Sequence, residues 1–124
     1  FSYFDYKRFN ALPSERKRAI NEFLDKLGVK PLITVIFGST AKGTFEKESD
    51  IDILLIFNKK EAGNRKLKED IEATTGIKIQ TFIIDFDYFK EQILKEEDKV
   101  IIHAIKTGFT ITGSDKFYKE VLNG

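Results

Sequence analysis

Apolar residues follow two different periods along this chain. Three short stretches are largely apolar and rich in β-branched residues, which predicts buried strands at 32–37, 50–57 and 77–84. Elsewhere apolar residues recur every three or four positions, which predicts helices. We expect helices at 14–27, 65–75 and 100–107, one beginning at Asp85 or Asp87, and one beginning at Ser114. A final short run at 109–112 predicts an edge strand.

The order of these elements places the chain in the α/β class. Helices and strands alternate, and such an order buries the strands in a sheet covered by helices. A length of 124 residues suits one compact unit, so we expect a single domain over 1–124. Residues 1–12 are rich in aromatic side chains but show no clear period. We interpret them as an aromatic lead-in that continues from a segment preceding the chain.

Charge and hydropathy exclude several classes of function. The formal net charge is +1, too small for the strong sequence-independent binding of nucleic acid that basic domains show. The basic run Arg16-Lys17-Arg18 is interpreted as a solvated helix face. No apolar run approaches the roughly 20 residues of a membrane span, and no signal peptide is visible. We therefore expect a cytoplasmic protein that binds neither membrane nor nucleic acid through this domain.

The cysteine and histidine content of the chain excludes disulfides and common zinc sites. The chain has no cysteine, which excludes disulfides and thiolate zinc sites. The single histidine, His103, excludes zinc motifs that need two. Its apolar neighbours indicate a packed helical residue rather than a catalytic one. The candidate chemistry lies instead between residues 38 and 52.

A glycine and a serine follow the first predicted strand. Gly38 lets a phosphate approach the backbone closely, because it has no side chain. Ser39 adds a hydroxyl donor, and the free N–H groups and dipole of a following helix favour an anion. The spacing from Gly38 to Gly43 matches the first part of a Walker A loop. Thr44 and Phe45 stand where that loop has Lys and then Ser or Thr, so a P-loop is excluded.

Two aspartates, Asp50 and Asp52, stand at the start of the second predicted strand. Alternation puts both side chains on one face, roughly 6.5–7 Å apart at the backbone. Carboxylates at that spacing can converge on one Mg²⁺, which prefers hard oxygen ligands. Without a cation, the two charges repel each other beside a core. Either feature alone is common, as a turn or as an exposed strand entry, but together they indicate a site for a triphosphate and its metal.

Two motifs resemble the signature of the DNA polymerase β-like nucleotidyltransferase superfamily. They read Phe37-Gly38-Ser39-Thr40-Ala41-Lys42-Gly43 and Ser49-Asp50-Ile51-Asp52-Ile53. The chain looks like the minimal nucleotidyltransferases of archaea and bacteria in particular. The motif match covers about residues 36–57, and the order of elements extends the resemblance over about residues 14–112.

The resemblance implies a small mixed β-sheet flanked by helices, the nucleotidyltransferase fold. It also implies transfer of a nucleoside monophosphate from an NTP, above all ATP, to a hydroxyl with release of pyrophosphate. The matching positions imply a nucleotide- and phosphate-binding set, Gly38, Ser39, Lys42 and Ser49, and a catalytic pair that binds Mg²⁺, Asp50 and Asp52. The sequence does not identify the acceptor, a protein or small-molecule hydroxyl. It also leaves open a homodimer through the edge at 109–112.

The chain departs from the family pattern at one position. The superfamily usually supplies a third carboxylate from the next core strand, and the position that aligns here is Gln80. Glutamine can bind a metal through its carbonyl, but it carries no charge and is a poor general base. Asp85 lies on the opposite face of that strand and is expected to cap a helix. The alternative hypothesis is a catalytically degenerate nucleotide-binding or regulatory module, antitoxin-like or attached to a DNA-binding domain.

Overall fold

A computed structural model describes residues 3–61 and 63–123, and their strands form one mixed sheet. The strands are β1 (Ile33–Phe37), β2 (Ile51–Phe57), β3 (Ile79–Asp85) and β4 (Phe109–Thr112), in the order β3-β2-β1-β4. β1 is antiparallel to β2 and to β4, whereas β2 and β3 are parallel. The predicted α/β class with a small mixed sheet is confirmed.

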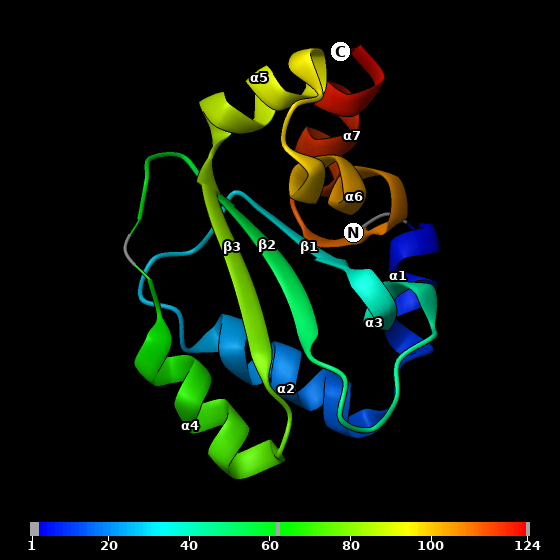
Figure 1. Ribbon diagram of the computed structural model, residues 1–124, viewed down its shortest axis with the longest axis vertical. Coiled ribbons are helices and arrows are strands. Elements are labelled where there is room, and N and C mark those ends of the chain that lie inside the picture. The colour runs from blue at the N-terminus through cyan, green and yellow to red at the C-terminus, as the bar shows by residue number, and fades with distance from the viewer. Residues whose placement is uncertain (1–2, 62, 124) are drawn as a thin grey trace.

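Helices cover both faces of this sheet. They are α1 (Tyr3–Asn10), α2 (Ser14–Asp25), α3 (Gly38–Lys42), α4 (Arg65–Thr75), α5 (Phe86–Lys95), α6 (Lys99–Thr107) and α7 (Ser114–Asn123). In Figure 1, α5, α6 and α7 gather at the top, and α2 and α4 lie at the bottom. Within the described residues, no helix combines the length and the apolarity needed to cross a bilayer.

Within the aromatic lead-in, residues 3–10 form the helix α1, which the apolar pattern of 1–12 does not predict. Residues 1 and 2 lie outside the described residues. The inner face of α1 carries Asp5 and Phe9, both buried and one helical turn apart. A buried aspartate interrupts the apolar period, and this is why the spacing of apolar residues does not reveal the helix.

The outer side of β4 is packed against α1. The backbone N–H of Thr110 in β4 donates to the carboxylate of Asp5 at 3.2 Å. The hydroxyl of Tyr118 in α7 donates to the same carboxylate at 2.9 Å. Part of the edge at 109–112 is therefore already hydrogen-bonded within the chain. A second copy of the chain would need free N–H groups there to extend the sheet.

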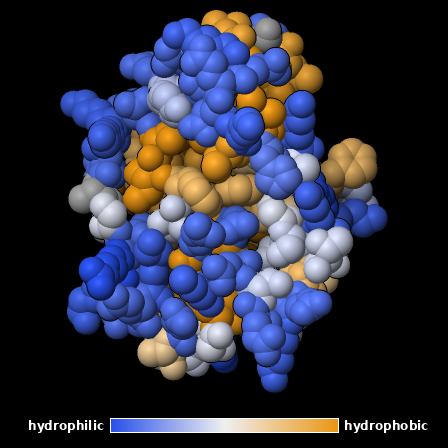
Figure 2. All heavy atoms as spheres, viewed as in Figure 1, coloured by the Kyte–Doolittle hydropathy of each residue, from blue (hydrophilic) through white to orange (hydrophobic). Residues whose placement is uncertain are grey.

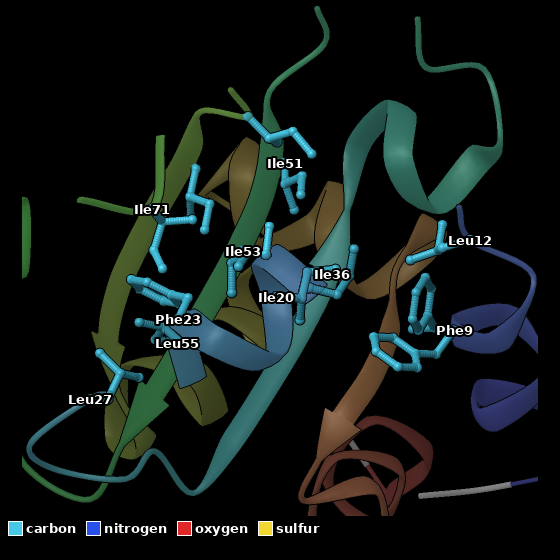
Figure 3. Packing of buried hydrophobic residues seen from close by; sticks show 14 of the residues in the cluster. Phe9, Leu12, Ile20, Phe23, Leu27, Ile36, Ile51, Ile53, Leu55 and Ile71 are labelled. Atoms are coloured by element: carbon cyan, nitrogen blue, oxygen red, sulfur yellow. The ribbon is translucent and has the colours of Figure 1, made fainter. Parts of the chain in front are cut away.

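One face of the sheet packs on α2 and α4. Figure 3 shows Ile20 and Phe23 of α2 pointing toward Ile53 and Leu55 of β2, with Ile71 of α4 beside them. All five side chains are almost completely buried. Packing on this face therefore fixes the position of β2. The alternate residues of β2 point to the opposite face of the sheet.

The other face packs on α5, α6 and α7. Leu54 and Ile56 of β2 are buried there with Phe89 of α5 and Phe117 of α7, whose rings stack at 5.7 Å. Figure 2 shows apolar side chains gathered across the middle of the molecule, between polar surfaces above and below. Alternation along β2 places Asp52 on this same face, at the end of the strand where the apolar packing stops.

Candidate active site

The chain turns directly from β1 into α3 at Gly38. This glycine has φ +69°, the left-handed region, which costs a residue with a Cβ about 1–2 kcal/mol. Within the part of the chain that the structure describes, no side chain caps the N-terminus of α3. Because α3 has five residues, its dipole is small, and anion binding there depends on backbone N–H groups and the Ser39 hydroxyl.

Asp52 packs directly against this turn. In the antiparallel register, Phe37 at the end of β1 pairs with Asp52 near the start of β2. A Cβ built on Gly38 would stand 2.3 Å from Oδ2 of Asp52. The carboxylate therefore occupies the space that any other side chain at position 38 would need. The glycine of one motif and the aspartate of the other meet in the fold.

The negative charges of Asp52 and Asp50 interact unfavourably in the fold. Burial raises the pKa of its carboxyl above the usual range, and the neighbouring Asp50 charge raises it further. His103 acts in the opposite direction. Two like charges in a partly desolvated place cost stability, and a bound divalent cation would recover it.

Gln80 lies beside Asp52, as the sequence alignment predicts. The parallel register pairs Asp52 of β2 with Gln80 of β3, and the Gln80 side chain is exposed. Asp85 pairs instead with Phe57 at the far end of these strands. Its carboxylate accepts a hydrogen bond from the Tyr88 N–H at 2.8 Å and caps α5, which confirms the expected helix cap.

These residues fit a magnesium ion that arrives with a nucleotide. Among residues 3–61 and 63–123, no group of three or more His, Cys, Asp or Glu could hold a metal. Mg²⁺ commonly takes one or two carboxylates from the protein and completes its shell with water and substrate phosphates. Asp50 and Asp52 supply that number, and the carbonyl of Gln80 is a further hard oxygen. The chemistry of this donor set, two carboxylates with a neutral oxygen in register beside them, fits such an ion.

The two remaining predicted phosphate contacts differ in their surroundings. Lys42 is exposed in the last turn of α3. The hydroxyl of Ser49 accepts a hydrogen bond from the Glu46 N–H at 2.8 Å, and the Ser49 N–H donates to the Glu46 carbonyl at 3.0 Å. Ser49 therefore closes a tight turn immediately before Asp50.

His103 lies nearer to the site than its apolar neighbours in the sequence indicate. It is half-buried in α6, and its ring meets the ring of Phe37 edge-on at 6.2 Å. Its effect on the pKa of Asp52 places it within electrostatic reach of that carboxylate. This proximity comes from the packing of α6 against α3 and β1, which no local spacing reveals.

The interpretation of residues 16–18 as a solvated helix face is wrong for Arg16, which is 3 % exposed. Helical spacing places Arg16 on the same face as Ala19, Ile20 and Phe23, which are all buried. The helical spacing is therefore the sequence signal that Arg16 is buried. The positive charge of Arg16 makes this signal easy to miss.

A separate cavity of about 370 Å³ lies between α5, α6 and α7. Its lining includes Ile93, Ile102 and Val121. None of the predicted site residues lines it, so this cavity is distinct from the carboxylates and the glycine turn.

The nucleotidyltransferase domain family matches residues 16–120, which is most of the chain. The chain therefore belongs to the nucleotidyltransferase domain family, and it is a nucleotidyltransferase. The resemblance seen in its two motifs is confirmed. A comparison with curated proteins gives no significant match.

Solved structures share this fold at low sequence identity. A toxin–antitoxin complex with AMP-PNP aligns with TM-score 0.62 and 17 % identity, covering 90 % of this chain and 83 % of that one. Two mutant MntA–HpeT toxin–antitoxin structures align with TM-scores of 0.61 and 0.58, at 16 % and 17 % identity. They cover 90 % and 86 % of this chain, and 83 % and 80 % of their own. At these identities, the likeness is one of fold.

Substituting Gly38 with alanine should displace the Asp52 carboxylate. Gly43→Ala is a matched control, because Gly43 has φ +76° but nothing within 4 Å of an added Cβ. Both variants should lose about 1–2 kcal/mol of unfolding free energy from the left-handed backbone. Only Gly38→Ala should weaken Mg²⁺-dependent ATP binding, by about 10-fold or more. Urea unfolding and calorimetric titration measure the two effects, and equal ATP binding by both variants would contradict the contact.

Substituting Asp52 with asparagine should stabilise the metal-free protein at neutral pH. Because the folded-state pKa of Asp52 is raised, the charged carboxylate opposes folding, and stability falls as pH rises through that pKa. At pH 7 the variant should gain about 0.5 kcal/mol after allowance for solvent screening, or roughly 2 °C in Tm.

Thermal unfolding of Asp52→Asn at several pH values measures this gain. The gain should vanish near about pH 3, where the carboxyl is protonated in the folded and unfolded states alike. Asp70→Asn, at an exposed α4 residue 3.8 Å from Lys66, is the control and should show no such gain. If Asp52→Asn is no more stable than the wild type at pH 7, the assigned electrostatic cost is wrong.

Proposed function

We propose that this chain transfers a nucleoside monophosphate, from ATP in the first instance, to a hydroxyl group of a protein partner. The packing of the Asp52 carboxylate against Gly38 is the observation that carries the proposal. It joins a phosphate-binding turn and a pair of metal-binding aspartates in one site. Membership of the nucleotidyltransferase domain family supports the same class of reaction.

Different residues would bind the phosphates and the metal. Gly38 and Ser39 would hold the triphosphate through backbone N–H groups and a hydroxyl, with the exposed Lys42 as a further phosphate contact. Asp50 and Asp52 would bind Mg²⁺, with Gln80 as a neutral third donor. When bound, Mg²⁺ supplies charge neutralisation on the phosphates and a fixed geometry for in-line displacement.

The reaction forms one bond to phosphorus and breaks another. The acceptor oxygen attacks the α-phosphorus, the bond from that phosphorus to the bridging α–β oxygen breaks, and pyrophosphate leaves with the electron pair. Gln80 can orient the acceptor by hydrogen bonding, but it cannot take the proton of the hydroxyl. That proton passes to water or to a basic group that the acceptor brings.

A protein acceptor is favoured over a small molecule by the structures that share the fold. The three aligned above are toxin–antitoxin structures, and one contains AMP-PNP, an analogue of ATP. A protein hydroxyl presented by a bound partner is therefore the acceptor class that we propose.

A second candidate function follows from one observation. Gln80 stands in register with Asp52, where the family pattern has a third carboxylate. A site with two carboxylates can retain Mg²⁺ and nucleotide while it transfers poorly, because a glutamine at the third position is a poor general base. The chain would then be a nucleotide-binding regulatory module.

Nucleotide binding and group transfer, measured together, separate the two candidates. ATP labelled at the α-phosphate is added with or without Mg²⁺, in the presence of a total protein extract as the source of acceptors. Mg²⁺-dependent pyrophosphate release and acid-precipitable label are expected. The variant carrying Asp50→Asn and Asp52→Asn should lose both by about 100-fold or more, whereas exposed Asp70→Asn should keep them. Labelling that survives loss of both aspartates would refute the site, and binding without release would favour the regulatory module.

A further inference from the structure

Arg16 is a charged residue buried behind the candidate site. It lies on the apolar face of α2 and is 3 % exposed. Burial lowers the pKa of its guanidinium, against the opposing effects of the Glu15 and Asp50 charges. A buried guanidinium needs hydrogen-bond acceptors to offset its lost hydration. Its partners therefore show what the arginine holds in place.

These partners belong to two separate parts of the site. Nη1 donates to the Thr40 hydroxyl in α3 at 2.9 Å. Nη2 donates to the backbone carbonyls of Glu46 at 3.0 Å and Ser49 at 2.8 Å. The guanidinium carbon lies 4.3 Å from the centroid of the Phe45 ring. One planar group thus joins α3 to both ends of the 46–49 turn that leads into Asp50.

Asp50 lies between two backbone anchors. Before it, the Ser49 carbonyl is held by Arg16 at 2.8 Å. After it, the Ile51 N–H donates to the Lys78 carbonyl at 2.9 Å. Asp50 precedes β2 in the chain, so the sheet ladder fixes only the second anchor. Without Arg16, the turn before Asp50 would keep its internal bonds between Glu46 and Ser49 but would lose its hydrogen bonds to α2.

We propose that Arg16 is a positioning residue that fixes Asp50 relative to the phosphate-binding turn at Gly38. It does so because its rigid fork binds α3 and the 46–49 turn at the same time. The inference rests on the proposed function, since it concerns the same metal and nucleotide site. A lysine could not replace it, because an ammonium is a point charge without the planar fork.

Two substitutions separate the geometry of Arg16 from its charge. Arg16→Lys keeps the positive charge and loses the fork. Arg16→Met keeps much of the volume and loses both charge and donors, so the Thr40 hydroxyl and the carbonyls of Glu46 and Ser49 lose their partner. Arg18→Gln, at an exposed residue of the same helix, is the matched control.

The first measurement is hydrogen exchange of the metal-free protein. Both Arg16 variants should exchange the backbone amides of 44–50 about 10-fold faster, while those of β2 and β3 stay as in the wild type. The second measurement is Mn²⁺ binding in the presence of ATP, followed by electron paramagnetic resonance. Both variants should bind Mn²⁺ about 10-fold more weakly, and Arg18→Gln should match the wild type.

Each contrary outcome overturns a defined part of the inference. Wild-type exchange of 44–50 in both folded variants would overturn the anchoring role, whatever the chemistry of the site. A faster-exchanging turn with unchanged Mn²⁺ affinity would reduce Arg16 to a purely structural residue. Wild-type affinity in Arg16→Lys but not in Arg16→Met would assign the effect to charge. A wild-type chain that binds no Mn²⁺ with ATP would overturn the proposed function, and the positioning role with it.

Discussion

The candidate site depends on the contact between the Asp52 carboxylate and the backbone of Gly38. Antiparallel pairing of β1 and β2 sets Phe37 opposite Asp52, and so brings the end of one strand beside the start of the other. A side chain at position 38 would occupy the space of Oδ2. The left-handed turn at Gly38, the start of α3 and the position of the aspartate pair are therefore one geometric unit rather than two motifs.

This unit concentrates charges where burial is costly. Asp52 is partly desolvated beside Asp50, and the buried guanidinium of Arg16 lies on the other side of the turn that precedes them. Such arrangements lower the stability of a domain, and natural proteins retain them mainly where binding or catalysis recovers the cost. The apolar layers on both faces of β2 supply the rigidity that holds these charges in place.

The sequence predicts the elements whose pattern is local and misses what depends on distant packing. The strands and the helix 65–75 follow from period and from Gly76, and the pairing of Gln80 with Asp52 agrees with the motif alignment. α1 is missed because Asp5 interrupts its apolar face. The burial of Arg16 is hidden by its charge, although its spacing matches the apolar stripe of α2. The nearness of His103 to Asp52 arises from helix packing, which a single sequence does not encode locally.

A crystal structure with AMP-PNP and Mn²⁺, with the metal located by its anomalous scattering, would test the central claim most directly. We expect Mn²⁺ in direct coordination by carboxylate oxygens of Asp50 and Asp52. We also expect the phosphates against the backbone of Gly38 and Ser39. Metal bound away from both aspartates, or a triphosphate placed away from the glycine turn, would contradict it.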